Sequence, residues 1–281
     1  MEFRELRPED RDWITACRDT RTHPFTALAF PSLYSWAEEY GLTVAGDADF
    51  FVIRSVHDGA FYCPCGDEDK CRAFIDGLES PAKLVYLTEE QAARLEKRGW
   101  SVRHREDLSE YIVSVAAEAL RNGHVSKSFR DKCRHFKNTF AYTARPIGPR
   151  DMPVLHRALS ALWDDPHEKL FGDYSVLRRL IEEYDALGVR GLLMETTEGK
   201  YAFVLGYKNT ADSFTVSIGK HSPGLPTETS VVIVHELARM LDGEYELLNM
   251  EEDLGLEGLR RAKELYSPVD RLEVYEASKP L

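Results

Sequence analysis

Hydrophobic and polar positions along the chain predict strands and helices that alternate. In the first half, apolar and aromatic runs on both sides of the turn His57-Asp58-Gly59 predict a hairpin. Thr88, which two glutamates follow, is placed to cap a helix that continues to Arg98. The predicted elements are, in order, hairpin strands at 49–54 and 59–64, a strand at 83–87, the helix at 88–98 and a strand at 100–105.

The second half repeats this arrangement with additional elements. Asp151 is expected to cap a first helix, and a second helix ends at Gly188, a residue typical of helix C-termini. The predicted elements are helices at 151–162 and 173–187, strands at 190–195, 201–207 and 213–219, a helix at 231–241, a strand at 245–250, a helix at 256–266 and a strand at 271–276. Both halves end in a strand, a helix and a strand, although their residues differ. Hairpins mixed with crossovers indicate an α/β or α+β fold, and the repetition suggests duplicated domains with a cleft.

The composition is typical of a folded, cytosolic chain. With 281 residues, 43% of them hydrophobic and 30% charged, the chain has the length of one large or two ordinary domains. Its apolar runs are far shorter than the ~20 residues that cross a bilayer, and its charged N-terminus lacks a signal-peptide core. We therefore expect a cytoplasmic protein without a transmembrane segment.

The cysteines favour a reducing compartment. Their number, five, is odd and small for a disulfide framework. Cys63, Cys65 and Cys71 cluster near His57, but their spacing differs from that of zinc knuckles. Because free cysteines are commonly buried, we expect structural thiols here rather than a metal site.

Charge is unevenly distributed along the chain. The net charge of −12 disfavours general nucleic-acid binding, but residues 121–150 carry eight Lys or Arg and one acid, Asp131, which makes this segment +7. Ser126 is expected to begin a helix here. Its apolar stripe is Phe129, Cys133, Phe136 and Phe140, and its cationic stripe is Lys127, Arg130, Arg134 and Lys137. The cationic stripe is either an ordinary solvated face or a site for a phosphate-bearing ligand, and the scarcity of acids favours the ligand.

Familiar catalytic motifs do not occur in this sequence. His235-Glu236 is followed by Arg239 where a zinc protease needs its second histidine, and the chain has neither a G-x-S-x-G elbow nor a P-loop. Residues 249–263 are more informative, because polar residues gather where a predicted strand ends and a helix begins, a place where α/β sheets bind ligands. Arg260 and Lys263 fall on one face of that helix. The alternative is that Asp253 only caps the helix, and that Arg260 pairs with a neighbouring glutamate.

Three segments resemble one protein family. They read NMEEDLGLEGLRRAKELYSP at 249–268, EYIVSVAAEALRNGHVSKSFRDKCRHFKNTF at 110–140 and FPSLYSWAEEYG at 30–41. The first is similar to a signature of the C-terminal domain family of phosphatidylglycerol lysyltransferase, in which an Asn, an acidic pair, D-L-G, G-L-R-x-A-K and a downstream Pro recur. The second resembles that family's central strand and basic helix.

The resemblance implies a fold and a reaction class. Members have two tandem GNAT-like acyltransferase domains with mixed sheets, related to the Fem-family aminoacyl transferases. We therefore expect domains at 1–120 and 151–281 with a basic helical connection at 121–150. In the family's lysyltransferases an aminoacyl group passes from tRNA to a lipid head group. For this chain the resemblance implies aminoacyl-tRNA as the donor, and a small amine or hydroxyl or a phospholipid head group as the acceptor.

The candidate site combines the family segments with the charge pattern. Glu252 and Asp253 are expected to act as the base or to orient the acceptor, and Arg260 and Lys263 to hold a phosphate or the oxyanion. Asn249, Lys127 and Arg130 are expected to contact substrate, the two cations by binding the anionic donor. Alanine at Arg260 or Lys263 is expected to abolish transfer without changing the melting curve.

Acyl-CoA is the alternative donor. Its pyrophosphate usually rests on backbone N–H groups that lead into a helix, and in the corresponding loop, residues 219–227, Pro223 and Pro226 have no N–H. Lys220 and His221 could still contact a phosphate. Aminoacyl-tRNA is therefore favoured over acyl-CoA. A third possibility is a non-catalytic module that binds tRNA or phospholipid head groups.

Overall fold

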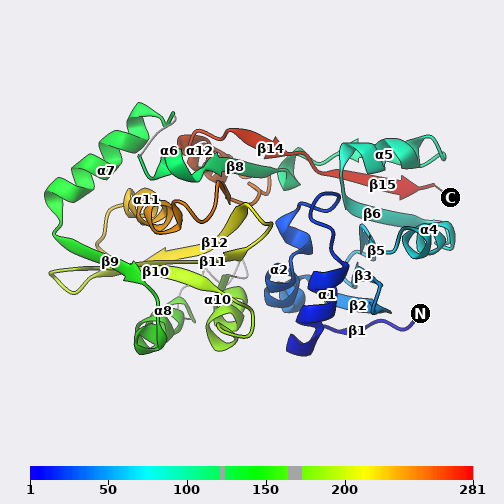
Figure 1. Ribbon diagram of the computed structural model, residues 1–281, viewed down its shortest axis with the longest axis horizontal. Coiled ribbons are helices and arrows are strands. Elements are labelled where there is room, and N and C mark those ends of the chain that lie inside the picture. The colour runs from blue at the N-terminus through cyan, green and yellow to red at the C-terminus, as the bar shows by residue number, and fades with distance from the viewer. Residues whose placement is uncertain (121–123, 164–172, 281) are drawn as a thin grey trace. The chain divides into compact units, whose positions relative to one another are not determined.

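The computed structural model describes residues 1–120, 124–163 and 173–280, which form two compact units (Figure 1). The first unit contains Met1–Glu110 together with Leu272–Leu281, and the second contains Tyr111–Arg271. These boundaries differ from the three expected segments, because the basic segment belongs to the second unit and the end of the chain returns to the first. None of the helices in the described part of the chain has the length and apolar character needed to span a bilayer.

A mixed sheet forms the centre of the first unit. Its strands are β1 (Arg4–Glu5), β2 (Leu42–Asp47), β3 (Phe50–Ser55), β4 (Phe61–Tyr62), β5 (Cys65–Gly66), β6 (Ala82–Leu87), β7 (Ser101–His104) and β15 (Tyr275–Lys279). They lie in the order β1-β2-β3-β4-β6-β15-β7, with β5 paired to β3. β4 and β6 run parallel, and the pairs on either side of them are antiparallel. The predicted hairpin is therefore confirmed as β3 and β4.

Helices cover both faces of this sheet because β3 is buried on both sides. The helices are α1 (Arg11–Cys17), α2 (Phe30–Ser35), α3 (Ala37–Tyr40), α4 (Glu68–Asp76) and α5 (Glu89–Glu96). Phe50 packs against Phe74 of α4, whereas the next residue, Phe51, contacts Trp13 of α1 from the other face. The predicted cap of α5 is confirmed, since the hydroxyl of Thr88 accepts a hydrogen bond from the N–H of Gln91 (3.3 Å).

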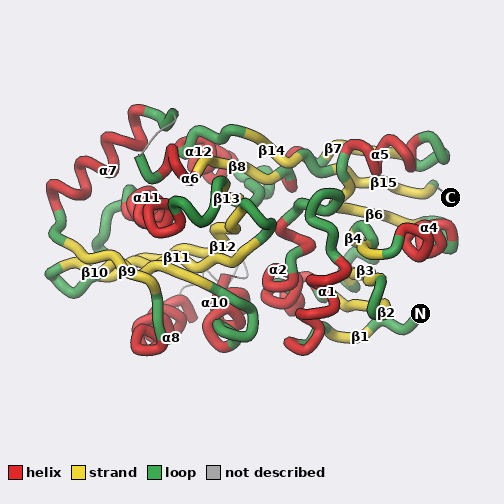
Figure 2. The backbone as a smooth tube through the Cα atoms, in the orientation of Figure 1, coloured by secondary structure: helices red, strands yellow, loops and turns green. Residues whose placement is uncertain are grey.

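A second mixed sheet forms the centre of the second unit. Its strands are β8 (Glu110–Ser114), β9 (Tyr142–Pro146), β10 (Arg190–Thr196), β11 (Tyr201–Lys208), β12 (Ser213–His221), β13 (Leu247–Asn249) and β14 (Asp270–Leu272). They lie in the order β14-β8-β13-β12-β11-β10-β9, as the yellow strands of Figure 2 show in part. β12 and β13 run parallel, while β13 is antiparallel to β8.

Helices also cover both faces of the second sheet. They are α6 (Val115–Glu118), α7 (Lys127–Thr139), α8 (Met152–Trp163), α10 (Asp173–Glu182), α11 (Thr229–Leu241) and α12 (Glu257–Leu265). Figure 1 shows α11 on one face and α8 and α10 on the other. α11 is buried from Val231 to Ala238, and it shares a core with Phe129 and Phe136 of α7. This confirms the predicted apolar stripe of the basic helix.

The two sheets repeat one pattern, which confirms the expected mixed α/β fold. In the second unit β13 lies between a parallel neighbour, β12, and an antiparallel one, β8. In the first unit β6 lies between parallel β4 and antiparallel β15. The prediction of one continuous strand at 271–276 is wrong. The chain forms β14 in one sheet, passes the fully buried Val274, and then forms β15 in the other sheet.

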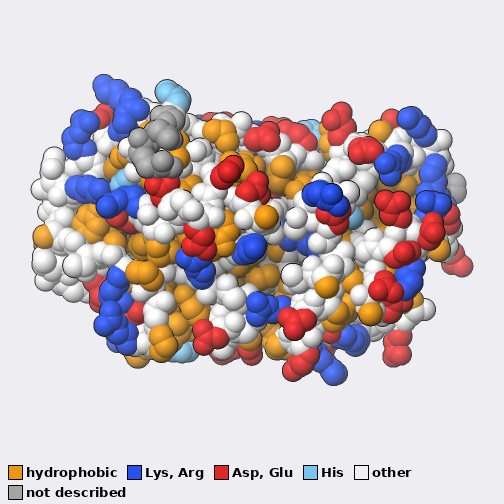
Figure 3. Space-filling model, viewed as in Figure 1, with side chains coloured by type: hydrophobic (Ala, Val, Ile, Leu, Met, Phe, Trp, Pro, Cys, Tyr) orange, Lys and Arg blue, Asp and Glu red, His pale blue; other side chains and the backbone are white. Residues whose placement is uncertain are grey.

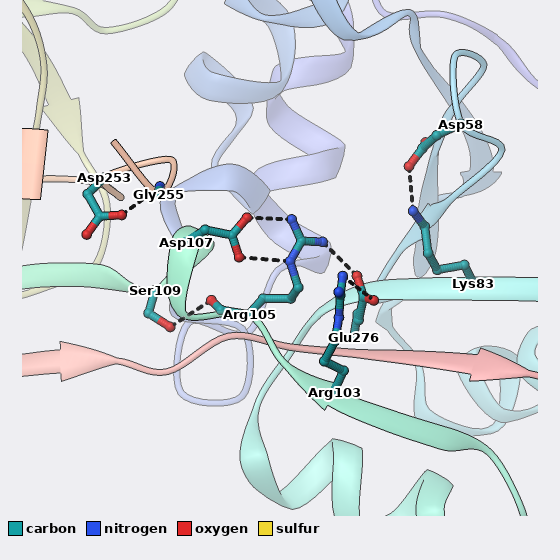
Figure 4. Close-up of polar contacts among 9 residues, drawn as sticks. All are labelled: Asp58, Lys83, Arg103, Arg105, Asp107, Ser109, Asp253, Gly255 and Glu276. Carbon is teal, nitrogen blue, oxygen red and sulfur yellow. Dashed lines mark hydrogen bonds and ion pairs between the residues drawn. The ribbon is translucent and has the colours of Figure 1, made fainter. Parts of the chain in front are cut away.

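Polar contacts in the first unit explain several charged and sulfur-containing residues. The guanidinium of Arg105 donates hydrogen bonds to Asp107 (2.7 and 2.9 Å) and to Glu276 of β15 (2.6 Å), which fixes the returning strand (Figure 4).

Cys63 and Cys65 are buried, and burial raises the pKa of both thiols. They have the environment of structural thiols, as the sequence predicts.

Candidate active site

A cavity opens in the second unit where the parallel strands separate. β12 and β13 pair for three residues, from Ser213 opposite Leu247 to Thr215 opposite Asn249. β12 then continues to His221, but the chain after Asn249 turns away, because Glu251 has a left-handed backbone (φ 60°). The buried side-chain oxygen of Asn249 accepts a hydrogen bond from the N–H of Glu251 (2.8 Å) and holds this turn. Asn249 thus shapes the gap between the strands.

The cavity has a volume of about 280 Å³ and an apolar interior with a polar side. Its apolar walls come from β11, β12, α11, α12 and the residues that follow β13 and α12, and they include Val204, Val216, Ile233, Met250 and Tyr266. The polar residues along it are Ser217, Lys220, His221, Thr229, Ser230 and Lys263. Three of the residues predicted from the sequence therefore meet here: Lys220, His221 and Lys263. The first two come from the end of β12 and the third from α12, more than 40 positions later.

A β-bulge at Ser217 shapes the wall of this cavity. Val216 lies opposite Gly206 of β11, but Ile218 lies opposite Leu205, so Ser217 is the extra residue and lies outside the pairing register. Gly206 makes this close approach possible, since a Cβ at that position would lie 2.0 Å from the carbonyl oxygen of Thr215. Sequence reasoning missed Ser217. The signal was Gly206, a lone glycine inside an apolar strand, which often marks a bulge.

Asp253 and Arg260 form a buried structural pair. Asp253 has no exposed surface, and its carboxylate accepts hydrogen bonds from the Tyr111 hydroxyl (2.7 Å), the Arg260 Nε (2.8 Å) and the N–H of Gly255 (2.8 Å). Figure 4 shows the bond to Gly255. Burial opposes ionisation, but the hydrogen bonds from Arg260, Tyr111 and Gly255 outweigh it and lower the pKa of Asp253. A carboxylate so held is a poor proton acceptor, so these contacts do not support the expected role of Asp253 as base.

Lys263 differs from Arg260 in its surroundings. Its ammonium donates a hydrogen bond to the carbonyl oxygen of Met250, and the side chain lines the cavity. Glu252 is half-buried. Neither Glu252 nor Asp253 is among the described residues that line the cavity. The arrangement of α12 thus separates the two predicted cations, because Arg260 is bonded to Asp253, whereas Lys263 is bonded to the carbonyl oxygen of Met250 and lines the cavity.

Lys127 and Arg130 lie elsewhere, on α7. The Ser126 hydroxyl caps this helix by accepting a hydrogen bond from the N–H of Phe129 (3.0 Å), as predicted. Lys127 borders a shallow depression of about 460 Å³ together with Lys132, His135 and Glu228. Basic side chains gather over α7 in Figure 3. Within the cationic stripe, Lys137 forms an ion pair with Glu236 (3.4 Å), and Arg134 forms one with Asp131 (3.3 Å). Neither Lys127 nor Arg130 is among the described residues of the cavity.

A buried acid close to Tyr266, one of the residues that line the cavity, was not predicted. Glu118 is completely buried, and neither of its carboxyl oxygens has a hydrogen-bond partner among the described residues. Burial raises the pKa of Glu118 to about 8, so the group is mostly uncharged at neutral pH. The neighbouring His235 donates a hydrogen bond from Nδ1 to the backbone carbonyl of Glu118 (2.7 Å). The available signal was the run of apolar residues on both sides of Glu118, from Val115 to Leu120.

Comparison with known proteins identifies the class. The family model for the C-terminal domain of phosphatidylglycerol lysyltransferase matches residues 21–278. This chain therefore belongs to that family, and its two mixed sheets form a tandem GNAT-like fold of the FemX kind. None of the curated protein sequences matches the chain.

Three solved structures share this fold. A conserved protein of unknown function from Bacteroides thetaiotaomicron is 25% identical with a TM-score of 0.81, and the match covers 98% of each chain. FemX is 10% identical with a TM-score of 0.60 over 100% of this chain and 98% of its own. The L-PGS of Bacillus licheniformis is 15% identical with a TM-score of 0.58 over 88% of this chain and 90% of its own.

Proposed function

We propose that this protein transfers an aminoacyl group from tRNA to an acceptor amine or hydroxyl, and that the reacting carbonyl lies in the cavity of the second unit. The observation that carries the proposal is the cavity between the separating strands β12 and β13, where Lys220, His221 and Lys263 meet beside the bulge at Ser217. Membership in the phosphatidylglycerol lysyltransferase family supports the reaction class. The acceptor is a small molecule or a phospholipid head group.

The transfer is an acyl substitution at an ester. A lone pair of the acceptor attacks the ester carbonyl, a new C–N or C–O bond forms, and the bond to the ribose oxygen breaks. The proton that the acceptor loses ends on the released ribose hydroxyl. His221 can carry this proton, because its Nδ1 donates to the carbonyl oxygen of Ser222 (3.3 Å) and leaves Nε2 with a lone pair. Lys263 and the bulged Ser217 both line the cavity, and in this proposal the ammonium of Lys263 and the backbone at Ser217 stabilise the oxyanion.

The other predicted residues have supporting roles in this proposal. Asp253 and Arg260 are positioning residues that hold the turn between β13 and α12, and they keep Lys263 directed at the cavity. Glu252, half-buried on the same turn, orients the acceptor. Lys220 binds the terminal phosphate of the donor. Lys127 and Arg130 bind other phosphates of the tRNA backbone, because cations on one helix face can neutralise several phosphates in a row.

The start of α11 favours aminoacyl-tRNA over acyl-CoA. In an anion site the first N–H groups of a helix point at the ligand. Here the N–H groups of Thr229, Ser230 and Val231 already donate to the carbonyl oxygens of residues 226–228 (3.0–3.3 Å). The side chain of Glu228, only 17% exposed, adds a negative charge at the same place. A pyrophosphate would therefore meet occupied donors and an acid.

Discharge of aminoacyl-tRNA tests the proposal. The wild-type protein is incubated with radiolabelled aminoacyl-tRNA and either phosphatidylglycerol vesicles or glycinamide as acceptor, and the labelled product is measured. Lys263→Met should reduce the rate about 100-fold or more, because one oxyanion donor is worth that factor. Arg261→Ala is the matched control, since Arg261 lies on the same helix and its side chain is 73% exposed. Binding of tRNA without discharge by the wild type would instead identify a non-catalytic module.

A further inference from the structure

The β-bulge of β12 places a hydroxyl-bearing residue, Ser217, in the wall of the cavity. In a regular strand Val216 and Gly219 would face opposite sides of the sheet, because they are three residues apart. Both line the cavity here, since the extra residue at Ser217 shifts the alternation by one position. Ile218, the next residue along the strand, is not among the described lining residues. The bulge thus adds Ser217 to a part of the wall that Val204 and Val216 make apolar.

The hydroxyl of Ser217 keeps its hydrogen-bonding capacity for a ligand. The residue is half-buried, and its hydroxyl forms no hydrogen bond with any residue in the described part of the chain. Other hydroxyls of the wall are used within the protein: Thr229 donates to the carbonyl oxygen of Pro226 (2.5 Å) and Tyr266 to that of Ser230 (3.3 Å). A serine hydroxyl can donate one hydrogen bond and accept two.

Ser217 lies near the closed end of the gap between β12 and β13. The two strands pair last at Thr215 and Asn249, and Ser217 follows two residues later. Lys220 and His221 lie three and four residues farther along β12, about 10–13 Å away at 3.3 Å per residue. In the proposed reaction the phosphate of the donor lies at Lys220 and the reacting carbonyl at the bulge. The α-carbon is bonded to that carbonyl, so its amino group comes close to the side chain of Ser217.

We infer that the Ser217 hydroxyl binds the α-amino group of the donor, and that it thereby distinguishes aminoacyl groups from simple acyl groups. The inference rests on the proposed function and deepens it, because it assigns the recognition of the aminoacyl class to one side chain. The hydroxyl oxygen can accept a hydrogen bond from the amino group in either protonation state of that amine. A propionyl group has a hydrogen atom in place of the amino group and cannot make this bond. A site that hydrogen-bonds one substrate group discriminates against an analogue that lacks it.

Binding of two stable donor analogues tests this inference without requiring turnover. The probes are the alanyl and propionyl amides of 3′-amino-3′-deoxyadenosine, in which an amide replaces the reactive ester. They differ only at the α-amino group. Titration calorimetry at one fixed pH and salt concentration should show that Ser217→Ala weakens binding of the alanyl analogue about three- to tenfold, the worth of one hydrogen bond. Binding of the propionyl analogue should change by less than about twofold.

The comparison of the two probes isolates the hydrogen bond. Any effect of the charge of the amine that does not involve Ser217 is the same in wild type and variant, so it cancels from the change in the affinity ratio. Ser217→Thr keeps a hydroxyl and should keep the wild-type ratio within about twofold. An equal loss for both probes in Ser217→Ala, an unchanged ratio, or binding of neither probe to the wild type would overturn the inference.

A second serine of the wall provides a matched comparison. Ser230 lines the cavity from α11, and Ser230→Ala should lower the alanyl-to-propionyl affinity ratio less than Ser217→Ala does. An equal or larger fall in Ser230→Ala would refute the assignment to Ser217.

Failure of the transfer reaction itself gives a different result. If the affinity ratio falls in Ser217→Ala but the wild type does not discharge alanyl-tRNA, the proposed transferase activity is wrong and the role of Ser217 in binding stands. If alanyl-tRNA is discharged but the ratio does not depend on Ser217, the activity stands and the inferred role is wrong.

Discussion

Replacing Arg260 with alanine should destabilise the second unit. Arg260 donates to a carboxylate, that of Asp253, which has no exposed surface. Removing one partner of a buried ion pair costs about 3–5 kcal/mol. The side chain of Arg260 is 35% exposed, so water already screens the pair, and we expect a smaller loss of about 2–3 kcal/mol in the free energy of unfolding. This differs from the expectation drawn from sequence, that alanine here would leave the melting curve unchanged.

Chemical and thermal unfolding measure this loss. For a chain of this size, about 1 kcal/mol corresponds to 2–4 °C, so the melting temperature should fall by roughly 4–12 °C. Arg261→Ala, one position away and highly exposed, should change the free energy of unfolding by less than about 0.5 kcal/mol. Adding Asp253→Asn should remove most of the additional effect of Arg260→Ala, because the two residues act as a pair.

The pH dependence gives a second check on the same pair. The pKa of Asp253 is lowered in the folded protein. Its contribution to stability is therefore present above the unfolded carboxyl pKa of about 4 and is lost as the pH falls through the lower folded pKa. The difference between wild type and Arg260→Ala should shrink in acid. A variant as stable as wild type at pH 7, or a difference that grows in acid, would refute the reasoning.

Two further predictions concern Glu118 and the basic helix. The pKa of Glu118 is raised to about 8, so its contribution to stability is present below the unfolded pKa of about 4.3 and is lost as the pH rises toward 8. Between pH 5.5 and 8.5, urea unfolding should show wild type losing about 3 kcal/mol relative to Glu118→Gln, and parallel curves would contradict the assigned burial. Lys127→Ala should reduce the slope of log affinity for tRNA against log salt by about 0.7–0.9, whereas Lys208→Ala, an exposed control, should not. An unchanged slope for Lys127→Ala would mean that tRNA binds to a surface other than that of α7.

Local physical chemistry explains what could be predicted from the sequence. Ser126 and Thr88 were identified as helix caps because capping depends on residues within three positions. The apolar stripe of α7 followed from its spacing, since a helix buries one face regardless of its partner. The cluster near the end of β13 was found because strand ends in α/β folds gather polar side chains.

The tertiary structure decided how those residues are used. Arg260 and Lys263 look equivalent on one helix, but only the folded chain brings Asp253 and Tyr111 to Arg260 and leaves Lys263 facing the cavity. β15 is inserted between β6 and β7 in the sheet of the first unit, and no local pattern along the chain records that pairing. The sequence by itself determined the elements and the charges, because these depend on neighbours along the chain. Pairing and burial depend on residues that are distant in the chain, so only the fold determined the site.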